Sequence, residues 1–527
     1  MSIAYAAFMD FKTRFEIQAL YWIRSLIDNA QVSPSDVFIF APNKGPNAYL
    51  DKLSSTFGVN CIQIEYPFKD QPFTNKIGLW EPEIFAAYDY VCFNDCDIFY
   101  LDPFDFSPEK DLYARVVDLP KPSVERLKII YSAAGLRLPD ICPVGWPWRP
   151  NTVTIKNNFN GGLYLVRREL VGPLGGLWKK WVMWGLDHVE AFGGKLKHLD
   201  QIAMSLAITE LSPAVVDLDL RYNCPTHLEP SRLVPQDIKP SVLHYHVHVD
   251  ANAHLMKSGH RGIDSQIARA NRKIAQWQGE GFENRFFWNF RYQNMPKRGS
   301  GLGSRGESLV VKRDALSALA PHVDSVLDVG CGDIEVTKDV PLKGYVGIDI
   351  SEEALKLARA KRRDWTFRSV EEEQDRDETF DLVLLLDVLI HQSSMADYRQ
   401  LIEFAVSRAN DLCLISGYDM APSVKSSIVF FHEPLGETLR SQPDLAAVGH
   451  VFDYRSTTVY ACIKKNSTRF LQAGQPADIA ALIDAYRTSK SARPLARLQD
   501  LAVWATEPAR KHAGRLYTQL RRRLRPR

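Results

Sequence analysis

Two carboxylates, Asp95 and Asp97, stand one residue apart where the apolar run in residues 91–104, VCFNDCDIFYLDPF, ends. Residues i and i+2 of an extended segment point to the same side, so both carboxylates can address one point. Hard oxygen ligands at that spacing suit Mg²⁺ or Mn²⁺ carrying substrate phosphates. A bare D-x-D is also common by chance, and an aspartate often ends a strand. Taken alone, the pair favours the polar end of a strand over a metal site.

A glycine turn in the second half of the chain has a distant acidic partner. The run SVLDVGCGD, residues 325–333, is typical of a buried strand that enters a glycine-rich turn, and YVGIDIS, residues 345–351, of a second strand ending in Asp349. Glycines let the backbone approach a nucleoside, and an acid at the end of the next strand accepts both ribose hydroxyls. Because Asp349 follows the turn by about 20 residues, as this geometry requires, the pattern predicts a nucleoside-cofactor site.

Strand-like and helix-like runs alternate through both halves, which predicts α/β domains with parallel strands. Residues 292–308, YQNMPKRGSGLGSRGES, are rich in glycine, serine and basic residues, and so indicate a boundary. Beyond about residue 466 only helical patterns remain. The expected divisions are a first domain over 1–275, a linker over 276–300, a second domain over 301–465 and a helical extension with a basic tail over 466–527.

The composition is that of several globular domains. The chain has 527 residues, 45% of them hydrophobic and 24% charged, and one domain takes about 100–200 residues. Its eight cysteines form no CxxC pair and fall mainly in apolar runs, which predicts reduced thiols in the cytoplasm. No run reaches the ~20 apolar residues of a membrane-spanning helix, and the first residues lack the pattern of a signal peptide.

Positive charge gathers in the last residues of the chain. The formal net charge is only +2, yet seven basic residues and no acidic one lie between Lys511 and Arg527. Leu516, Leu520 and Leu524 share one helical face there. The tail is therefore either an amphipathic helix at the inner face of a membrane or a solvated terminus. One short cluster without interleaved aromatic residues argues against nucleic acid as a partner.

Motifs of the first half resemble the family 8 glycosyltransferases, which have the GT-A nucleotide-sugar-binding fold. TNKIGLWEPEIFAAYDYVCFNDCDIFYLDPF supplies a lysine, a buried strand and a closing D-x-D. Three further matches follow in the family's order, namely NNFNGGLYLV (157–166), HLDQIAMSLAI (198–208) and SVLHYHVHV (241–249). Their order carries the resemblance more than any single motif does.

The resemblance implies metal-dependent transfer of a sugar from a nucleotide-sugar donor. Asp95, Asp97 and His244 would hold Mn²⁺ or Mg²⁺, with Asp95 also reaching the ribose and His246 the next candidate after His244. The ion stabilises the departing diphosphate, and Lys76 would add a second countercharge. The residues implied beside the donor sugar are Asn160, Gly161, Asp200 and Gln201.

Ordinary structural roles stay open for several of these residues. Lys76 is otherwise a solvated side chain, and Asp200 the first acid of a helix. The family's lysine–tryptophan pair after the late histidine is missing, since Lys257 has no tryptophan behind it. Trp146 and Trp148 in CPVGWPWRP either stack on sugars or pack on the domain.

The Asp328-Val-Gly-Cys-Gly order looks like motif I of class I S-adenosylmethionine-dependent methyltransferases, which have a Rossmann-like fold. FDLVLLLDVLIHQ (380–392) is similar to their fourth strand. Ile334 stands where the family often has a glycine, which puts the shape of the turn in question. The resemblance implies a cofactor site whose residues are Asp328, Gly330 and Gly332 at the methionine end, Asp349 at the ribose, and Ser369 and Val370 near the adenine.

A hydroxyl acceptor must also lose its proton, and two histidines are candidates for the general base. His391 lies just past the fourth strand, where its alternative role is to cap a helix or fill the core. His432, beside Glu433 in FFHEPL, is the rival.

These motifs predict a bifunctional transferase that adds a sugar and a methyl group to the same growing glycan or glycolipid, as in surface polysaccharide synthesis. Fusion would keep the product near the second site at high effective concentration. Two alternatives remain. Either one domain alone is catalytic, with the methyltransferase half the inert one, or the chain methylates RNA, protein or another small molecule while its first domain only recognises sugar.

Overall fold

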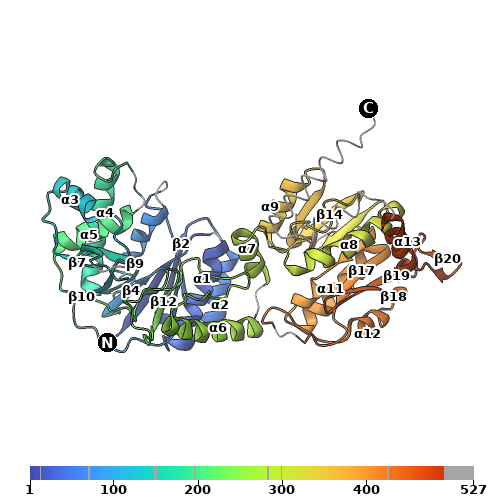
Figure 1. The fold of residues 1–527 in the computed structure, drawn as a ribbon, viewed down its shortest axis with the longest axis horizontal. Coiled ribbons are helices and arrows are strands. Elements are labelled where there is room, and N and C mark those ends of the chain that lie inside the picture. Colours follow the sequence, from blue (N-terminus) through green and yellow to red (C-terminus); the bar gives the residue numbers. More distant parts are fainter. Residues whose placement is uncertain are drawn as a thin grey trace. The chain divides into compact units, whose positions relative to one another are not determined.

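The computed structural model describes residues 1–11, 13–68, 72–146, 151–194, 196, 198–281, 284–297, 299–374, 376–423 and 426–491. The chain divides into two compact units, Met1–Ile274 and Ala275–Arg527 (Figure 1). The expected basic tail and Trp148 lie outside the described residues. Each unit has its own α/β architecture.

The first unit is built on a mixed seven-stranded sheet. Its strands are β1 (Ile3–Phe8), β2 (Val37–Pro42), β3 (Asn60–Ile64), β4 (Tyr90–Asn94), β6 (Leu112–Val116), β9 (Phe159–Arg167) and β10 (Val215–Asp217). Their order is β10-β6-β9-β4-β1-β2-β3, and β9 runs antiparallel to both its neighbours while the other pairs are parallel. Strands β2 and β4 are buried along their whole length, as central strands covered on both faces are.

Two smaller sheets complete the strands of this unit. One has the order β11-β12-β5, from Cys224–Pro225, Val242–His244 and Ile98–Tyr100, and the other pairs β7 (Ile141–Pro143) with β8 (Val153–Ile155). The helices are α1 (Thr13–Arg24), α2 (Ala48–Phe57), the 3₁₀ segment η3 (Pro72–Leu79), α3 (Val124–Ala133), α4 (Arg168–Asp187), α5 (Leu199–Leu211) and α6 (Arg261–Gly281), the last crossing the division between units.

The second unit has one seven-stranded sheet. Its strands are β13 (Val326–Val329), β14 (Tyr345–Asp349), β15 (Thr366–Ser369), β16 (Phe380–Leu385), β17 (Ala409–Gly417), β18 (Leu445–Tyr454) and β19 (Thr457–Lys464). The order is β15-β14-β13-β16-β17-β19-β18, parallel as far as β17, with β19 antiparallel to both neighbours. This is the class I methyltransferase fold, so the fold expected for this half is confirmed.

The helices of the second unit, most of them labelled in Figure 1, are α7 (Asn284–Asn294), α8 (Gly306–Leu319), α9 (Glu352–Lys361), α10 (Val370–Gln374), α11 (Met395–Arg408), α12 (Leu435–Arg440) and α13 (Ile479–Ser491). Ser351 and Ser394 begin α9 and α11 by accepting backbone N–H groups of the first turn, which leaves fewer helix-end donors unpaired.

Two segments differ from their expected roles. Residues 276–300, expected as a linker, contain the end of α6 and all of α7, because Phe287 and Phe290 bury their rings in the unit. The extension from residue 466 is not helical throughout, since β20 (Leu471–Gln472) and β21 (Gln475–Pro476) pair before α13. Its apolar side chains Phe470, Ile479 and Ile483 belong to the core of the second unit.

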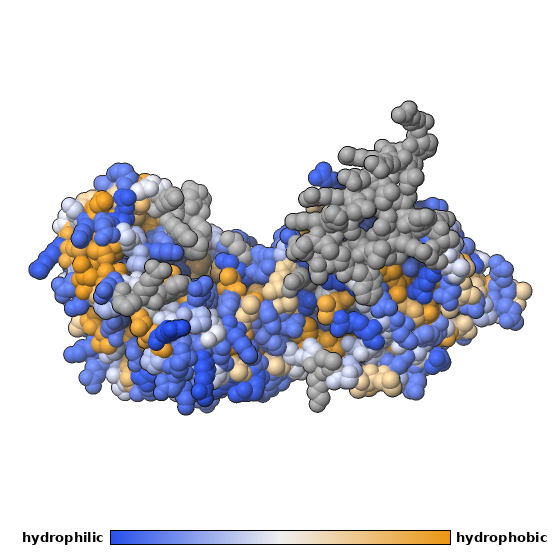
Figure 2. Space-filling model, in the orientation of Figure 1, coloured by the Kyte–Doolittle hydropathy of each residue, from blue (hydrophilic) through white to orange (hydrophobic). Residues whose placement is uncertain are grey.

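The surface carries scattered apolar side chains. On the first unit these include Ile129, Ile141 and Met183, and Figure 2 shows apolar colour over the region of α5 and β7. Among the helices that the structure describes, none combines the length and apolarity needed to cross a membrane.

Candidate functional site

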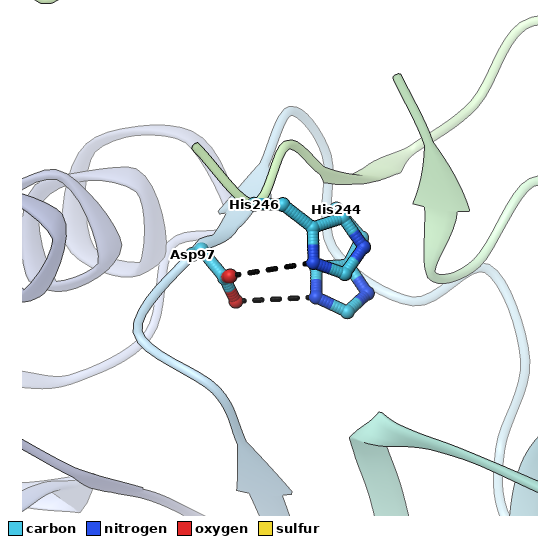
Figure 3. Close-up of side chains that lie close together, drawn as sticks. All are labelled: Asp97, His244 and His246. Atoms are coloured by element: carbon cyan, nitrogen blue, oxygen red, sulfur yellow. Dashed lines mark ion pairs between the residues drawn. The ribbon is translucent and has the colours of Figure 1, made fainter. Parts of the chain in front are cut away.

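Three potential metal ligands lie together in the first unit. Asp97, His244 and His246 each offer a ligand atom, and these atoms lie within 4.8 Å of one another (Figure 3). One carboxylate oxygen of Asp97 lies 3.2 Å from Nε2 of His244 and the other 3.7 Å from Nδ1 of His246. The two imidazoles stack with ring centroids 3.8 Å apart. Among the described residues, this is the one group of three or more histidine, cysteine or acidic side chains placed closely enough to hold a metal ion.

Different elements supply the three side chains. Asp97 lies in the turn between β4 and β5, and His244 ends β12, whose antiparallel pairing places it opposite Ile98 of β5. Strand β12 stops at His244, and the chain turns at His246, where φ is +51°. The two rings therefore share a side because of a left-handed turn and not because they alternate along one strand.

Buried atoms in this group lack hydrogen bonds. Within the described part of the chain, Oδ1 of Asp97 and Nε2 of both His244 and His246 have no hydrogen-bond partner. An unpaired buried polar atom costs about 1–3 kcal/mol, so Oδ1 of Asp97 and Nε2 of His244, which face each other, indicate an absent ligand, while His246 faces Asp97 with its other nitrogen, Nδ1. Carboxylate and imidazole are both ligands of divalent ions. The residues present therefore fit a metal ion.

The charge states of the group are coupled. Burial raises the pKa of Asp97, but His244, His246 and Lys76 outweigh it and the pKa falls below its usual range. Burial lowers the pKa of His244, yet Asp97 raises it overall. Burial and the neighbouring His244 lower the pKa of His246. Without a metal, the favoured state is an ionised Asp97 beside a charged His244 and a neutral His246.

A chain of amides sets the orientation of His244. The backbone N–H of Gly162 donates to Asn160 at 2.9 Å, which identifies that atom as the amide oxygen. The same oxygen accepts from the side-chain nitrogen of Asn223 at 3.2 Å, so the oxygen of Asn223 faces Nδ1 of His244, 2.7 Å away. Nδ1 must then carry a proton whatever the charge of the ring, so Nε2 of His244 faces Asp97 with a proton when the imidazole is charged and with a lone pair when it is neutral.

The other end of this network is an ion pair. The amide nitrogen of Asn160 donates to Asp118 at 2.8 Å, and Arg115 donates to Asp118 at 2.5 Å. Asn160, expected beside the donor sugar, thus uses both ends of its side chain to support His244. The sequence analysis missed Asn223, Asp118 and Arg115, which stand in no motif and meet only through the fold.

Asp95 has a different partner from Asp97. Its carboxylate forms an ion pair with Lys76. Burial lowers the pKa of Lys76, but Asp95, Asp200 and Asp97 raise it overall, so all three carboxylates act on this ammonium group. Gln201, expected beside the donor sugar, donates its side-chain N–H to Asn158 at 2.9 Å. Trp146 is fully buried and donates to the carbonyl of Glu229, as a packing residue does.

The second unit places its glycine turn against Asp349. The backbone N–H groups of Gly332 and Ser351 both donate to that carboxylate at 2.8 Å. Gly330 and Gly332 have positive φ, and a Cβ at either would collide, with Val388 and with the hydroxyl of Tyr292 respectively. Close neighbours and left-handed backbone explain both glycines.

Ile334, which stands where the family often has a glycine, does not prevent the left-handed turn. It keeps a left-handed φ of +53°, although a β-branched side chain disfavours that region. Its side chain is buried in the core of the unit. Packing therefore holds the turn in the conformation that a glycine would adopt without strain.

Two acids of the expected cofactor site are hard to ionise. Burial raises the pKa of Asp349 to about 6 and that of Asp328 to about 7. The hydroxyl of Tyr345 donates to Asp328 at 2.6 Å. Ser369 pairs with Asp349 in the sheet, and the next side chain, Val370, is 43% exposed. An exposed apolar side chain beside this carboxylate suits a flat heterocycle.

The two candidate bases differ in what their nitrogens contact. Nδ1 of His391 lies 2.6 Å from the carbonyl of Ile428 and must donate to it, and no described residue bonds to its Nε2. Burial lowers the pKa of His391, which keeps the imidazole neutral. Nε2 of His432 instead contacts the carbonyl of Gln392 at 2.9 Å. Each histidine thus keeps one nitrogen with a lone pair, Nε2 in His391 and Nδ1 in His432, and His391 is the one whose ring lies against Trp288 of α7.

Helix α7 covers the edge of the sheet where these residues lie, which the sequence analysis missed. Asn289 accepts from the hydroxyl of Ser351 at 2.7 Å, and the ring of Trp288 meets His391 with centroids 4.9 Å apart. Tyr292 lies against the glycine turn. The expected boundary segment therefore forms one wall of the candidate cofactor site.

A buried ion pair lies beside this site. Lys312 of α8 pairs with Asp387, which follows β16 and has a left-handed φ of +61°. Tyr454 donates to the same carboxylate at 2.5 Å. Burial raises the pKa of Asp387, but Lys312 and Tyr454 lower it overall. The pair ties α8 to the end of β16.

Comparison with known proteins concerns mainly the second unit. Residues 327–411 match the family described as "Methyltransferase domain". No curated protein matches the chain in sequence. Among solved structures, magnesium protoporphyrin IX methyltransferase from Synechocystis PCC 6803 with bound SAM is 17% identical and covers 38% of this chain and 96% of its own, with a TM-score of 0.25.

Another solved structure, mouse xyloside xylosyltransferase 1 in its apo form, is 12% identical and covers 47% of this chain and 98% of its own, with a TM-score of 0.31. Likenesses of this size establish no activity. The family match and the strand order together show that the second unit contains a methyltransferase domain.

Proposed function

We propose that the chain is a two-site transferase, whose second unit moves a methyl group from S-adenosylmethionine to a hydroxyl and whose first unit moves a sugar from a nucleotide-sugar donor. The observation that carries the methyl transfer is the glycine turn bound to Asp349 in the second unit, with His391 near the same edge of the sheet. The family match over residues 327–411 supports it.

The cofactor fits the edge of the sheet that α7 covers. Gly330 and Gly332 give the turn its left-handed backbone, and Asp349 has lone pairs for two ribose hydroxyls. Val370 offers an apolar surface to the adenine. When bound, S-adenosylmethionine supplies an activated methyl group on a sulfonium.

His391 acts as the general base for the acceptor. Its Nε2 takes the hydroxyl proton as the oxygen–carbon bond forms and the carbon–sulfur bond breaks. The carbonyl of Ile428 holds the proton on Nδ1 and so keeps the basic nitrogen free. A lowered pKa keeps that nitrogen unprotonated at neutral pH.

Two variants test this site separately. Asp349→Ala should abolish binding of labelled S-adenosylmethionine. His391→Ala should bind the cofactor as the wild type does, yet lose about 10²–10⁴-fold in methyl transfer. His432→Ala is the matched control and should keep both properties. Cofactor binding unaffected by Asp349→Ala would exclude this site.

Sugar transfer by the first unit rests on the group of Asp97, His244 and His246 with Lys76 beside it. A divalent ion there would stabilise the diphosphate as the glycosyl bond breaks. Lys76 and Asp95 would position the donor, and Asp200 acts on the same ammonium group and would face the sugar. The mixed sheet of the unit, with the D-x-D just past β4, supports the GT-A interpretation.

A donor screen tests this half. Nucleotide sugars are incubated with the full chain, with and without Mn²⁺, and the released nucleoside diphosphate is measured. Asp97→Asn should lose turnover, whereas Asp349→Ala should retain it. Equal turnover in Asp97→Asn and the wild type would leave the methyltransferase as the catalytic half.

Both acceptors are hydroxyl groups, so one glycan or glycolipid can serve the two sites in turn. Joining the units then raises the effective concentration of the first product at the second site. Labelled sugar and labelled methyl should appear in one product.

A further inference from the structure

We infer that the metal centre of the first unit takes His244, His246 and Asp97 as its protein ligands, and that it selects first-row transition ions over Mg²⁺. Only the use of the ion rests on the proposed sugar transfer, because metal binding can be measured without a donor. The ligand set differs from the one expected from the sequence, in which Asp95 stood in place of His246.

Asp95 is committed to Lys76. Their ion pair is partly buried, each side chain being 25% exposed. Asp95 also falls outside the group of side chains whose ligand atoms lie within 4.8 Å of one another. Asp97 has no lysine or arginine partner among the described residues, and its ion-pair contacts run to His244 and His246.

The backbone brings His246 to the group. A non-glycine residue in the left-handed region costs about 1–3 kcal/mol and persists only where its surroundings hold it. Here Gln18 donates to the carbonyl of His246 at 2.7 Å, and the N–H of His248 donates to Tyr245 at 2.8 Å. The turn stacks the His246 ring on His244 and directs Nδ1 toward Asp97.

The ligand chemistry sets the selectivity. Mg²⁺ prefers oxygen ligands in an octahedron and releases its waters reluctantly. Imidazole nitrogens suit transition ions such as Fe²⁺, Ni²⁺ and Zn²⁺, and the affinity of such a site rises from Mn²⁺ through Fe²⁺ to Co²⁺. Two imidazoles and one carboxylate leave further positions for diphosphate oxygens. The site should therefore retain a transition ion in the presence of excess Mg²⁺.

Titration with Co²⁺ tests the ligand set on the full chain without a histidine tag. Visible absorption of Co²⁺ reports nitrogen and oxygen ligands directly, with no donor and no turnover. The wild type should bind Co²⁺, and His246→Ala and Asp97→Asn should bind it at least about tenfold more weakly. Asp95→Asn and His248→Ala, the latter a control on the same segment, should bind as the wild type does.

Several results would overturn the inference. These are wild-type affinity in His246→Ala, loss of binding in Asp95→Asn, displacement of Co²⁺ by an equal concentration of Mg²⁺, or no binding by the wild type. Thermal unfolding of each metal-free variant checks the fold, and His246→Gln replaces His246→Ala if the latter unfolds. Intact Co²⁺ binding without sugar transfer would refute the proposed function and leave this inference standing.

Discussion

Nδ1 of His244 donates its proton to the side-chain oxygen of Asn223 at 2.7 Å. That contact decides which nitrogen of His244 faces Asp97, because an imidazole whose Nδ1 is protonated offers only Nε2 as a ligand. Asn223 is itself in the left-handed region, with φ +61°, which asparagine tolerates better than most residues. The proposed metal site thus depends on Asn223, which is not one of its ligands.

Replacing Asn223 should weaken metal binding without removing a ligand. In Asn223→Ala, His244 loses its acceptor and can rotate or change tautomer, so Co²⁺ affinity should fall about 10–100-fold. Asn223→Asp keeps an acceptor for His244 but loses the donor to Asn160, and an intermediate affinity is expected. Titration of the wild type and the two variants with Co²⁺ measures the order of their affinities. Equal affinities for Asn223→Ala and the wild type would contradict the predicted order.

Neighbouring glycines on β9 should respond very differently to a methyl group. A Cβ at Gly162 would lie 2.5 Å from Cε1 and 2.7 Å from Nδ1 of His244, whereas one at Gly161 would come no closer than 4.0 Å to Lys76. Gly162→Ala should therefore displace His244 and reduce Co²⁺ affinity at least about tenfold. Gly161→Ala is the matched control and should keep the affinity. Similar losses in both variants would show a general effect on β9.

Local patterns predicted much of the second unit. The strands around Asp328 and Asp349 and the glycine turn between them follow from short apolar runs and from φ requirements that glycine meets. The role of α7 could not be predicted, because the contacts of Asn289 and Trp288 join segments far apart in the chain. The glycine, serine and basic residues that follow α7 in the sequence suggested a linker instead.

In the first unit the sequence predicted the types of ligand better than their geometry. Asp97 and His244 came from motif order, but the turn at His246 has no local signal, since neither glycine nor proline stands in SVLHYHVHV and positive φ is uncommon for any other residue. The partner of Asp95 depends on where the η3 segment places Lys76. Asn223 meets His244 only because β11 and β12 pair side by side.

Binding of S-adenosylmethionine should weaken as the pH falls from about 7 to about 6, the range in which Asp328 and Asp349 titrate. Burial raises both pKa values, and ribose hydroxyls need the carboxylate of Asp349 as acceptor. Each proton taken up reduces affinity by up to about tenfold per pH unit. Calorimetry between these pH values and pH 8 measures the slope.

The folding stability of the unliganded chain should change with pH in the opposite direction to the cofactor affinity. Both acids have folded-state pKa values above the usual range of aspartate, so the protonated forms stabilise the fold and this stability is lost as the pH rises through about 6 and 7. Asp349→Asn should bind the cofactor weakly and with a shallower pH dependence than the wild type. A flat wild-type profile would show that neither acid titrates near the ligand.

The pair of Lys312 and Asp387 should show strong coupling in stability. Lys312 is almost fully buried, so removing either partner leaves a charge without its counterion, whereas removing both does not. Lys312→Met should destabilise the second unit by about 3 kcal/mol, at the low end for a buried pair because Asp387 is partly exposed. Asp387→Asn preserves the left-handed backbone, which asparagine tolerates.

The double variant should therefore be more stable than the sum of the two single losses allows. Urea unfolding of the full chain measures this, with the transition of the second unit identified by hydrogen exchange in β16 and α8. Asp381→Asn lies in β16, the strand that Asp387 follows, and its carboxylate accepts from the backbone N–H of Asp324; combined with Lys312→Met it serves as a control and should give additive losses. Additive losses for Lys312 and Asp387 as well would mean that the two charges do not stabilise each other in the folded chain.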